Sequence, residues 1–155
     1  MILALLLAMA QATPSPAPAP VPSSAPPSSS IDGLPLGTLP RQSLPAAGCA
    51  AYLFTTGETR ALAVMATADP GMLRLSLDGR VTDLARAEAS GAAKLGLTQQ
   101  SVFRSATATA TLDLTIESRQ NLMAGAMVPR ATLQLDRPGQ DTLVIPLAGL
   151  VGCRA

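Results

Sequence analysis

Histidine and tryptophan are absent from this 155-residue sequence, and aromatic residues are scarce. Without histidine the chain lacks the commonest general base and a usual ligand of zinc, copper and haem. Three aromatic residues, Tyr52, Phe54 and Phe103, are too few to stack single-stranded bases or to form a sugar-binding platform. We therefore expect a protein that is not an enzyme and that holds no metal or cofactor.

Charge is sparse and balanced, with eleven basic and ten acidic residues and a formal net charge of +1. The charged residues are scattered singly from Asp32 onward, so no basic patch is predicted that could neutralise several phosphates. Nucleic acid is therefore not expected as a partner. Two pairs of carboxylates, Asp78 with Asp83 and Asp113 with Glu117, have the residue types needed for acid–base catalysis. We expect them instead to be exposed charges on strands.

The first thirty residues differ in composition from the rest. Ile2 to Ala10 form a short apolar run, and Ala10-Gln11-Ala12 before Thr13 has the small-residue spacing of a signal peptidase site, which predicts a cleaved signal peptide at residues 1–12. The run is too short for a transmembrane helix, which needs about 20 apolar residues. Residues 13–30 are rich in Pro, Ala and Ser, which predicts a disordered linker; a Pro-rich ligand of SH3-type domains is the alternative. We expect a periplasmic or secreted protein whose folded domain spans residues 31–155.

The only cysteines, Cys49 and Cys153, lie near the two ends of that domain. In an exported protein they are expected to form a disulfide, and two cysteines allow one bridge. Closing a loop of about 100 residues is worth roughly 4.7 kcal/mol in the chain-entropy model. The alternative, a redox or nucleophilic thiol, lacks a CxxC spacing and a histidine partner.

Alternating apolar and polar residues predict β-strands along the domain. From Thr107 to Glu117 every second residue is apolar. Asp78-Gly79 predicts a tight hairpin turn between strands at residues 72–77 and 81–84, and a second hairpin is predicted to turn at residues 137–140. Further strands at residues 52–55 and 60–67 bring the number to seven or eight. The pattern predicts an all-β fold, a small antiparallel barrel or sandwich closed by one disulfide.

One segment is ambiguous at this level. Residues 85–93 could form a short helix, but Ser90-Gly91 within them favours a loop.

About forty residues in the middle of the domain resemble a known family. LRLSLDGRVTDLARAEASGAAK from Leu73 to Lys94, followed by VFRS and ATATLDL, is similar to the membrane-bound and periplasmic inhibitors of C-type lysozyme. In that family a strand pair with the pattern L-x-L-x-G leads into an A-S-G-A loop and then into an aromatic-containing strand. The resemblance implies an eight-stranded antiparallel barrel with a terminal disulfide, to which Cys49 and Cys153 are similar.

The resemblance also implies a partner and a binding site. The partner would be a C-type lysozyme or another envelope protein, and its acidic active-site cleft would be blocked by a loop serine and a basic hairpin residue. A cation on a rigid hairpin can form charge-assisted hydrogen bonds to paired carboxylates. The residues implied for binding are Ser90, Gly91, Lys94 and Arg104.

Two alternatives stay open. Ser90-Gly91 could be a tight surface turn, with Lys94 and Arg104 as solvated charges. The domain could also be a structural or small-molecule-binding barrel of the cell envelope, in which those residues have no special role.

Overall fold

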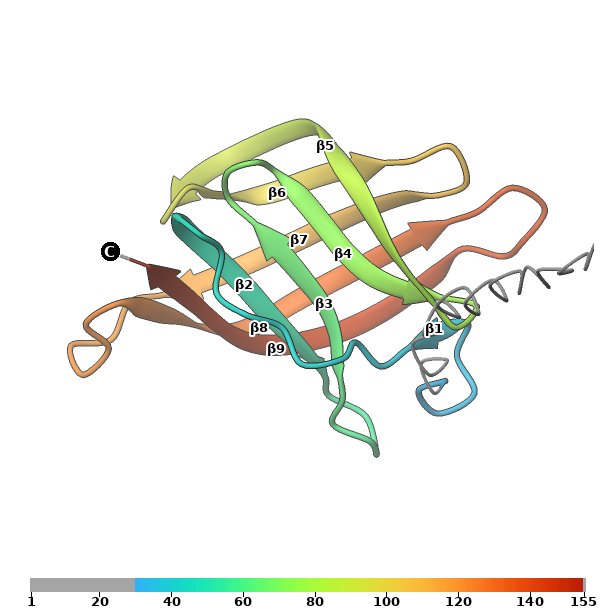
Figure 1. The fold of residues 1–155 in the computed structure, drawn as a ribbon, viewed down its shortest axis with the longest axis horizontal. Helices are drawn as coiled ribbons and strands as arrows, with labels where there is room; N and C mark the ends of the chain where they lie inside the picture. Colours follow the sequence, from blue (N-terminus) through green and yellow to red (C-terminus); the bar gives the residue numbers. More distant parts are fainter. Residues whose placement is uncertain (1–29, 155) are drawn as a thin grey trace, which may run out of the picture.

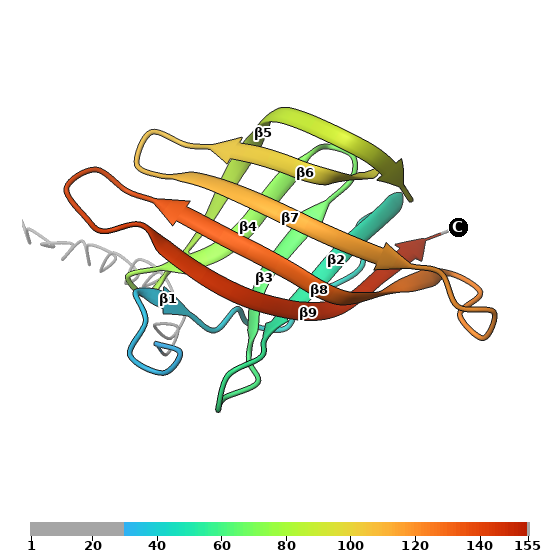
Figure 2. The ribbon, with the colours of Figure 1, turned by 180° about the vertical axis from the view of Figure 1, so that it is seen from behind.

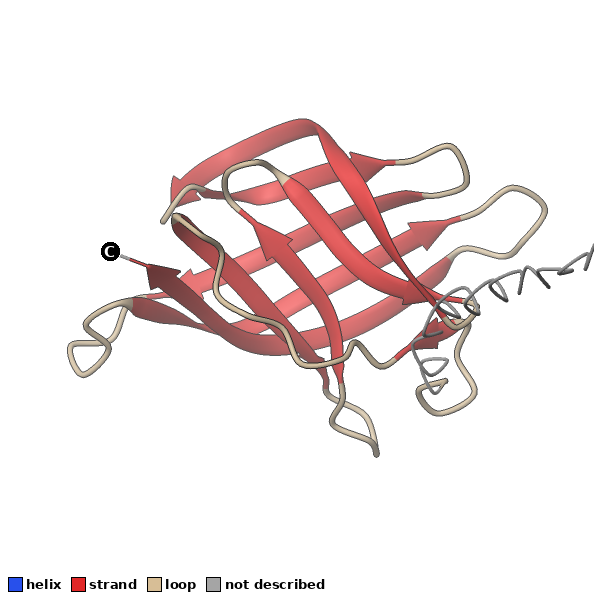
Figure 3. Ribbon diagram, in the orientation of Figure 1, coloured by secondary structure: helices blue, strands red, loops and turns tan. Residues whose placement is uncertain are grey.

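A computed structural model of the protein describes residues 30–154, which contain nine strands and no helix (Figure 3). Among these residues no segment forms a helix with the length and apolar character needed to cross a membrane. The predicted signal peptide, and the predicted linker apart from Ser30, lie outside the described residues. The strands are β1 (Leu36–Gly37), β2 (Gly48–Thr55), β3 (Leu62–Thr67), β4 (Met72–Leu77), β5 (Arg80–Lys94), β6 (Leu97–Arg104), β7 (Thr109–Glu117), β8 (Gly125–Asp136) and β9 (Leu143–Arg154).

The strands from β2 to β9 form a closed antiparallel barrel in which each strand pairs with its neighbours in sequence (Figures 1 and 2). The pairing of β2 with β9 closes the ring. Because the strands alternate in direction, the β4–β5, β6–β7 and β8–β9 turns lie at one end of the barrel. The start of β2 and the end of β9, with the cystine, lie at the other end, which we call the cystine end. The predicted all-β fold with seven or eight strands is confirmed as an eight-stranded barrel with one additional strand, β1.

Aliphatic side chains fill the barrel interior, as the alternation in the sequence requires. On β7 the predicted face is confirmed, because Ala110, Leu112 and Leu114 are buried while the residues between them are partly exposed. The same period of two places Leu73 and Leu75 of β4 inside. Burying each large apolar side chain stabilises the fold by about 1.5–3 kcal/mol. The largest fully buried side chains include Phe103, Leu53, Leu84, Leu133, Leu135 and Leu147.

The segment before β2 lies across the outside of the barrel. β1 pairs with the end of β4, and residues 38–47 then run over β3 and β2 (Figure 1). The backbone N–H of Leu39 donates to the carbonyl of Leu62, and the Tyr52 hydroxyl donates to the carbonyl of Ser43. Leu39 and Met65 pack in a second small apolar cluster beneath this segment. Outward-facing apolar residues of β2 and β3 are therefore covered by the chain's own strap, residues 38–47.

The predicted disulfide joins β2 to β9 at the point where the barrel closes. Cys49 and Cys153 are direct register partners, with a Cα–Cα distance of 4.0 Å. The Cys49 carbonyl accepts from Ala68, and the Cys153 N–H donates to Ala124, so neither bonds to the other strand at this position. This is a non-hydrogen-bonded pair, in which the side chains of opposite residues lie closest.

The prediction for residues 85–93 is wrong. These residues belong neither to a helix nor to a loop, but continue β5 as far as Lys94. The turn follows later, at Leu95-Gly96, where both residues have positive φ. Ser90-Gly91 is accommodated in the strand by a register shift between Ser90 and Ala93. A β-bulge with glycine in the left-handed region permits this, and the sequence pattern of a bulge resembles that of a turn.

The disulfide should carry a measurable share of the stability. Replacing both cysteines, Cys49→Ser with Cys153→Ser, should lower the free energy of unfolding by about 2–5 kcal/mol, because the bridge spans 104 residues of the unfolded chain. Urea denaturation monitored by circular dichroism measures this change. A reductant should lower the stability of the wild-type protein by the same amount and leave that of the double variant unchanged. Equal stabilities of the oxidised wild-type protein and the double variant would contradict the prediction.

The close approach of β2 and β9 should make Gly149 irreplaceable. A Cβ at Gly149 would lie well inside van der Waals contact with the backbone oxygen of Tyr52, so Gly149→Ala must push the closing strands apart. We expect a loss of about 1–3 kcal/mol in the free energy of unfolding. Gly57→Ala is the matched control, because its Cβ would meet only the Asp32 carboxylate at 3.5 Å and should change stability little.

Candidate functional site

The β5–β6 hairpin carries all four residues that the sequence analysis selected. β5 pairs with β4 only as far as Ala85, after which the Arg86 N–H bonds to the carbonyl of Gly71. Beyond this point β5 pairs with β6 alone, and its other edge has no backbone partner among residues 30–154. Every residue from Ala87 to Gly96 is exposed. The second half of β5 is therefore accessible on both faces and along one edge.

Small residues and two irregularities shape this exposed strand. Ala87 is an extra residue between the pairs made by Arg86 and Glu88, and Gly91 and Ala92 together oppose Gln99. Gly91 has a φ of +80°, and a Cβ at this position would lie 2.8 Å from the Cβ of Gln99. Only glycine fits both the backbone conformation and the space. Gly91 therefore has a structural role in the bulge, whether or not it contacts a partner.

Ser90 and Arg104 lie on the outer face of the hairpin. The Ser90 hydroxyl donates to the Gln100 side-chain oxygen at 3.4 Å, and the Gln100 amide donates to Asp113 at 2.9 Å, so a polar row crosses three strands. Arg104 donates from Nη2 to Glu88 Oε1 at 2.7 Å. Both partners of this ion pair are more than half exposed, so it adds little to stability. It does neutralise the Arg104 charge locally.

Lys94 lies on the opposite face. It pairs with Leu97, which is buried, and shares a shallow pocket at the cystine end with Leu97, Leu114 and Ile116. Its ammonium donates to the backbone carbonyl of Ile116 at 3.3 Å and makes no ion pair with a described residue. Lys94, the only lysine in the sequence, is therefore a cation whose charge no carboxylate of residues 30–154 compensates by an ion pair.

The paired carboxylates considered from the sequence each bind a neighbour. Asp83 pairs with Arg74, Asp78 with Arg137 and Asp113 with Gln100. Among the described residues no group of three or more His, Cys, Asp or Glu side chains is placed to hold a metal ion. The hairpin offers a hydroxyl, an amide and two cations.

Comparison of the chain with protein-family models, with curated proteins and with solved structures finds no significant match in any of the three. The resemblance to lysozyme inhibitors therefore stays a prediction that rests on the residues from Leu73 to Leu114.

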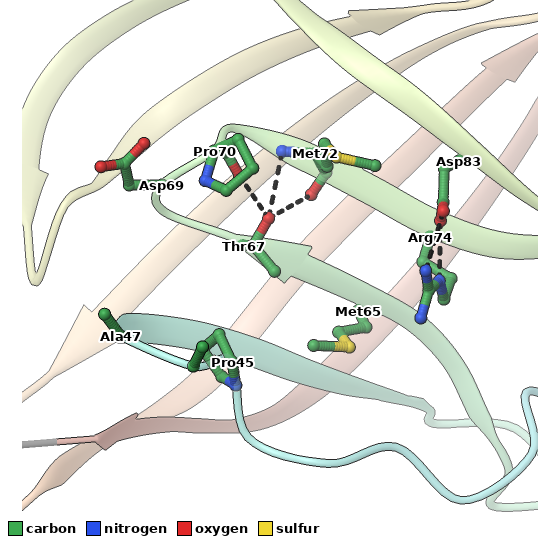
Figure 4. Close-up of a pocket in the computed structure, with 10 residues that line it drawn as sticks. Pro45, Ala47, Met65, Thr67, Asp69, Pro70, Met72, Arg74 and Asp83 are labelled. Atoms are coloured by element: carbon green, nitrogen blue, oxygen red, sulfur yellow. Dashed lines mark hydrogen bonds and ion pairs between the residues drawn. The ribbon is translucent and has the colours of Figure 1, made fainter.

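The structure also forms a pocket of about 360 Å³ outside the barrel (Figure 4). The end of the strap, Pro45 to Ala47, forms one side, and the outer face of the β3–β4 hairpin forms the other. Met65 and Met72 supply flexible apolar walls. The Thr67 hydroxyl points toward the turn, where it donates to the carbonyl of Pro70 and accepts from the N–H of Met72. It presents no free polar group, so this wall of the pocket is effectively apolar.

An ion pair forms one end of this pocket. Arg74 donates from Nε and Nη2 to the two carboxylate oxygens of Asp83, at 2.7 and 2.8 Å, and from Nη1 to the side chain of Gln42 in the strap. These hydrogen bonds hold the pKa of Asp83 below its ordinary value of 3.8 and raise that of Arg74. The pair fixes the strap against β4 and β5.

Sequence reasoning missed this pocket. It is made of segments that the chain separates, and the outward positions of β3 and β4 read as an ordinary solvent face. One signal was present: Met65 and Met72 stand at positions that alternation assigns to the outside. Apolar residues on an outer strand face indicate that something covers them.

The Arg74–Asp83 pair should make the free energy of unfolding depend on pH in the acidic range. Because the folded-state pKa of Asp83 is lowered, its contribution is present above the ordinary value of 3.8 and is lost as the pH falls below it. The free energy of unfolding should therefore fall less steeply between about pH 5 and pH 2 in Asp83→Asn than in the wild type. The difference in the total fall should be less than about 1 kcal/mol. Denaturation at a series of pH values measures it. Asp141→Asn, which removes an exposed carboxylate that makes no ion pair with a described residue, is the matched control. Identical slopes for Asp83→Asn and the wild type would exclude the linkage.

Proposed function

We propose that this protein is an exported, non-catalytic binding module that places its β5–β6 hairpin in the acidic cleft of a partner protein. The observation that carries the proposal is the uninterrupted exposure of β5 and its turn from Ala87 to Gly96. A paired strand that is open on both faces and at one edge can enter a cleft without the barrel unfolding. The resemblance of residues 73–114 to lysozyme inhibitors favours a C-type lysozyme as that partner.

The two cations of the hairpin have different roles in this proposal. Lys94 is available at once, because its ammonium is bound only to a backbone carbonyl. Arg104 must exchange Glu88 for a carboxylate of the partner, which reduces the net gain. Ser90 contributes a hydroxyl on the outer face, and its bond to Gln100 is long enough to be replaced easily. Lys94 should therefore contribute more to affinity than Arg104.

Export supports the same proposal. The apolar run and small-residue spacing at residues 1–12 favour a signal peptide. A disulfide between Cys49 and Cys153 is the bond expected outside the reducing cytosol. We infer that the domain acts in the periplasm or after secretion, where it would meet such a partner.

Lysis of peptidoglycan by C-type lysozyme, followed by turbidity, tests the function. The purified protein at micromolar concentration should slow lysis. Lys94→Ala should weaken inhibition by at least about tenfold, since losing a charge-assisted hydrogen bond to a desolvated carboxylate costs on the order of 1.5–3 kcal/mol. Arg104→Ala and Ser90→Ala should weaken it several-fold.

Arg60→Ala provides the matched control, because it removes an exposed cation from the connection between β2 and β3, at the end of the barrel opposite the β5–β6 turn. It should inhibit as the wild type does. Undiminished lysis in the presence of the wild-type protein would reject lysozyme as the partner. Inhibition that none of the three hairpin variants weakens would reject the hairpin as the binding surface.

The apolar pocket under the strap supports a second candidate function, the binding of a small apolar molecule. Its volume of about 360 Å³ lies in the range of small-molecule sites, about 300–1,000 Å³. The neutral fluorescent probe N-phenyl-1-naphthylamine should then bind with a rise in emission. Met72→Lys should abolish this rise, whereas Met123→Lys, at a fully exposed position, should preserve it. Emission that Met72→Lys leaves unchanged would exclude the pocket.

A further inference from the structure

The end of the barrel opposite the cystine end forms a mouth with two arginines. The mouth is a pocket of about 660 Å³ bordered by the β4–β5, β6–β7 and β8–β9 turns, which Figure 1 places together. Arg80 and Thr82 pair with Leu77 and Leu75, which face the interior, so their side chains point to the same side. Arg137 reaches the pocket from the β8–β9 turn.

Arg137 is the central feature of this mouth. Its side chain is only 10% exposed, and Nη1 donates to Asp78 Oδ2 at 2.7 Å. A guanidinium has five N–H donors, and this is the one bond that Arg137 makes with the side chains of residues 30–154. The only buried side-chain atom without a partner in that part of the chain is Ser76 Oγ, so the remaining Arg137 donors are not sealed off. These donors stay accessible, and Arg137 lines the pocket.

The charged side chains that line the pocket do not cancel. Arg80 and Arg137 bring two positive charges, and Asp78 brings one negative charge. Arg80 is exposed and makes no ion pair with a described residue. Asp78 is 69% exposed at its side chain, so water screens it, whereas the Arg137 side chain is almost buried. The inner side of the mouth is therefore electropositive, and Thr82 and Thr107 add polar lining groups.

We propose that this mouth binds a small organic anion, with a carboxylate or phosphoryl group held between Arg80 and Arg137. The planar guanidinium of Arg137 can donate two parallel hydrogen bonds to either group. The apolar part of the ligand lies against Leu77, Ala106 and Pro138, which line the same pocket. The mouth lies at the other end of the barrel from Lys94 and the β5–β6 turn. Arg104 ends β6 near the mouth, but it lies on the outer face and does not line the pocket.

Nuclear magnetic resonance of the arginine Nε–Hε groups in the purified protein tests the site. Hexanoate and hexyl phosphate serve as anionic probes, and hexanol serves as the uncharged probe of the same chain length. The signals of Arg80 and Arg137, assigned by their disappearance in single variants, should shift and saturate with an anionic probe and not with hexanol. The stronger of the two anions distinguishes a carboxylate from a phosphoryl ligand.

Substitutions then test the assignment. Arg80→Gln should weaken the anion about tenfold, and because Arg80 makes no ion pair it should leave the melting temperature unchanged. Arg137→Lys keeps the charge but loses the planar pair of donors, so affinity should fall several-fold while the link to Asp78 remains possible. Arg130→Gln, a cation on β8 that does not line the mouth, should bind as the wild type does.

Three results would overturn the proposal. The first is the absence of a saturable shift at Arg80 and Arg137 with both anions. The second is an equal shift at Arg130, which would indicate binding to any exposed arginine. The third is unchanged affinity in Arg80→Gln, which stays informative even if Arg137→Lys does not fold.

Discussion

The pairing of β2 with β9 is the contact on which the rest of the molecule depends. Seven consecutive hairpins would otherwise leave an open sheet with two exposed edges and an apolar face without cover. Eight register pairs, from Gly48 with Arg154 to Thr55 with Leu147, join the two ends of that sheet. The cystine fixes one end of this ladder, and the close approach at Gly149 leaves no room for a side chain. Because the barrel is closed, the apolar side chains at every second position of each strand meet in one common core.

Closure also explains why β5 is unusual. A short strand, β4, can cover only the first part of β5, which continues well beyond it. The uncovered part has a neighbouring strand on one side only, and its side chains are small except for those of Glu88 and Lys94. Two bulges twist this edge, which protects it from pairing with other chains. The long exposed stretch of β5 is thus produced by a mismatch of strand lengths, and the Ser90 and Lys94 side chains are presented there.

Apolar and charged surfaces lie at different places on the barrel. The outer wall beneath the strap is apolar and closed by the Arg74–Asp83 pair. The mouth at the β4–β5 end holds Arg80 and Arg137, while Lys94 lies at the cystine end. Although the net charge is only +1, positive charge is therefore concentrated at two separate places on the barrel. Because a packed interior is difficult to use for binding, the surface and the two ends are where this fold can act.

The sequence determined the parts that depend on local pattern. The alternation of residues 107–117 follows from the side-chain period of a strand, and the Asp78-Gly79 turn follows from backbone preference. The pairing of Cys49 with Cys153 follows from the presence of only two cysteines, together with the proposed export. Two neighbouring pairs, β4 with β5 and β8 with β9, follow as well, because a tight turn joins adjacent antiparallel strands. The β5 bulge was not predictable, since Ser90-Gly91 has the composition of a turn and only the partner strand distinguishes the two.

Tertiary structure alone decided where functional side chains meet. Arg137 and Asp78 are 59 residues apart, and the Gln42 contact with Arg74 spans 32 residues. Ser90 and Lys94 are close in sequence yet face opposite sides, because the bulge between them changes the alternation. Such contacts depend on barrel closure and on the path of the strap, and closure joins segments that no local pattern connects.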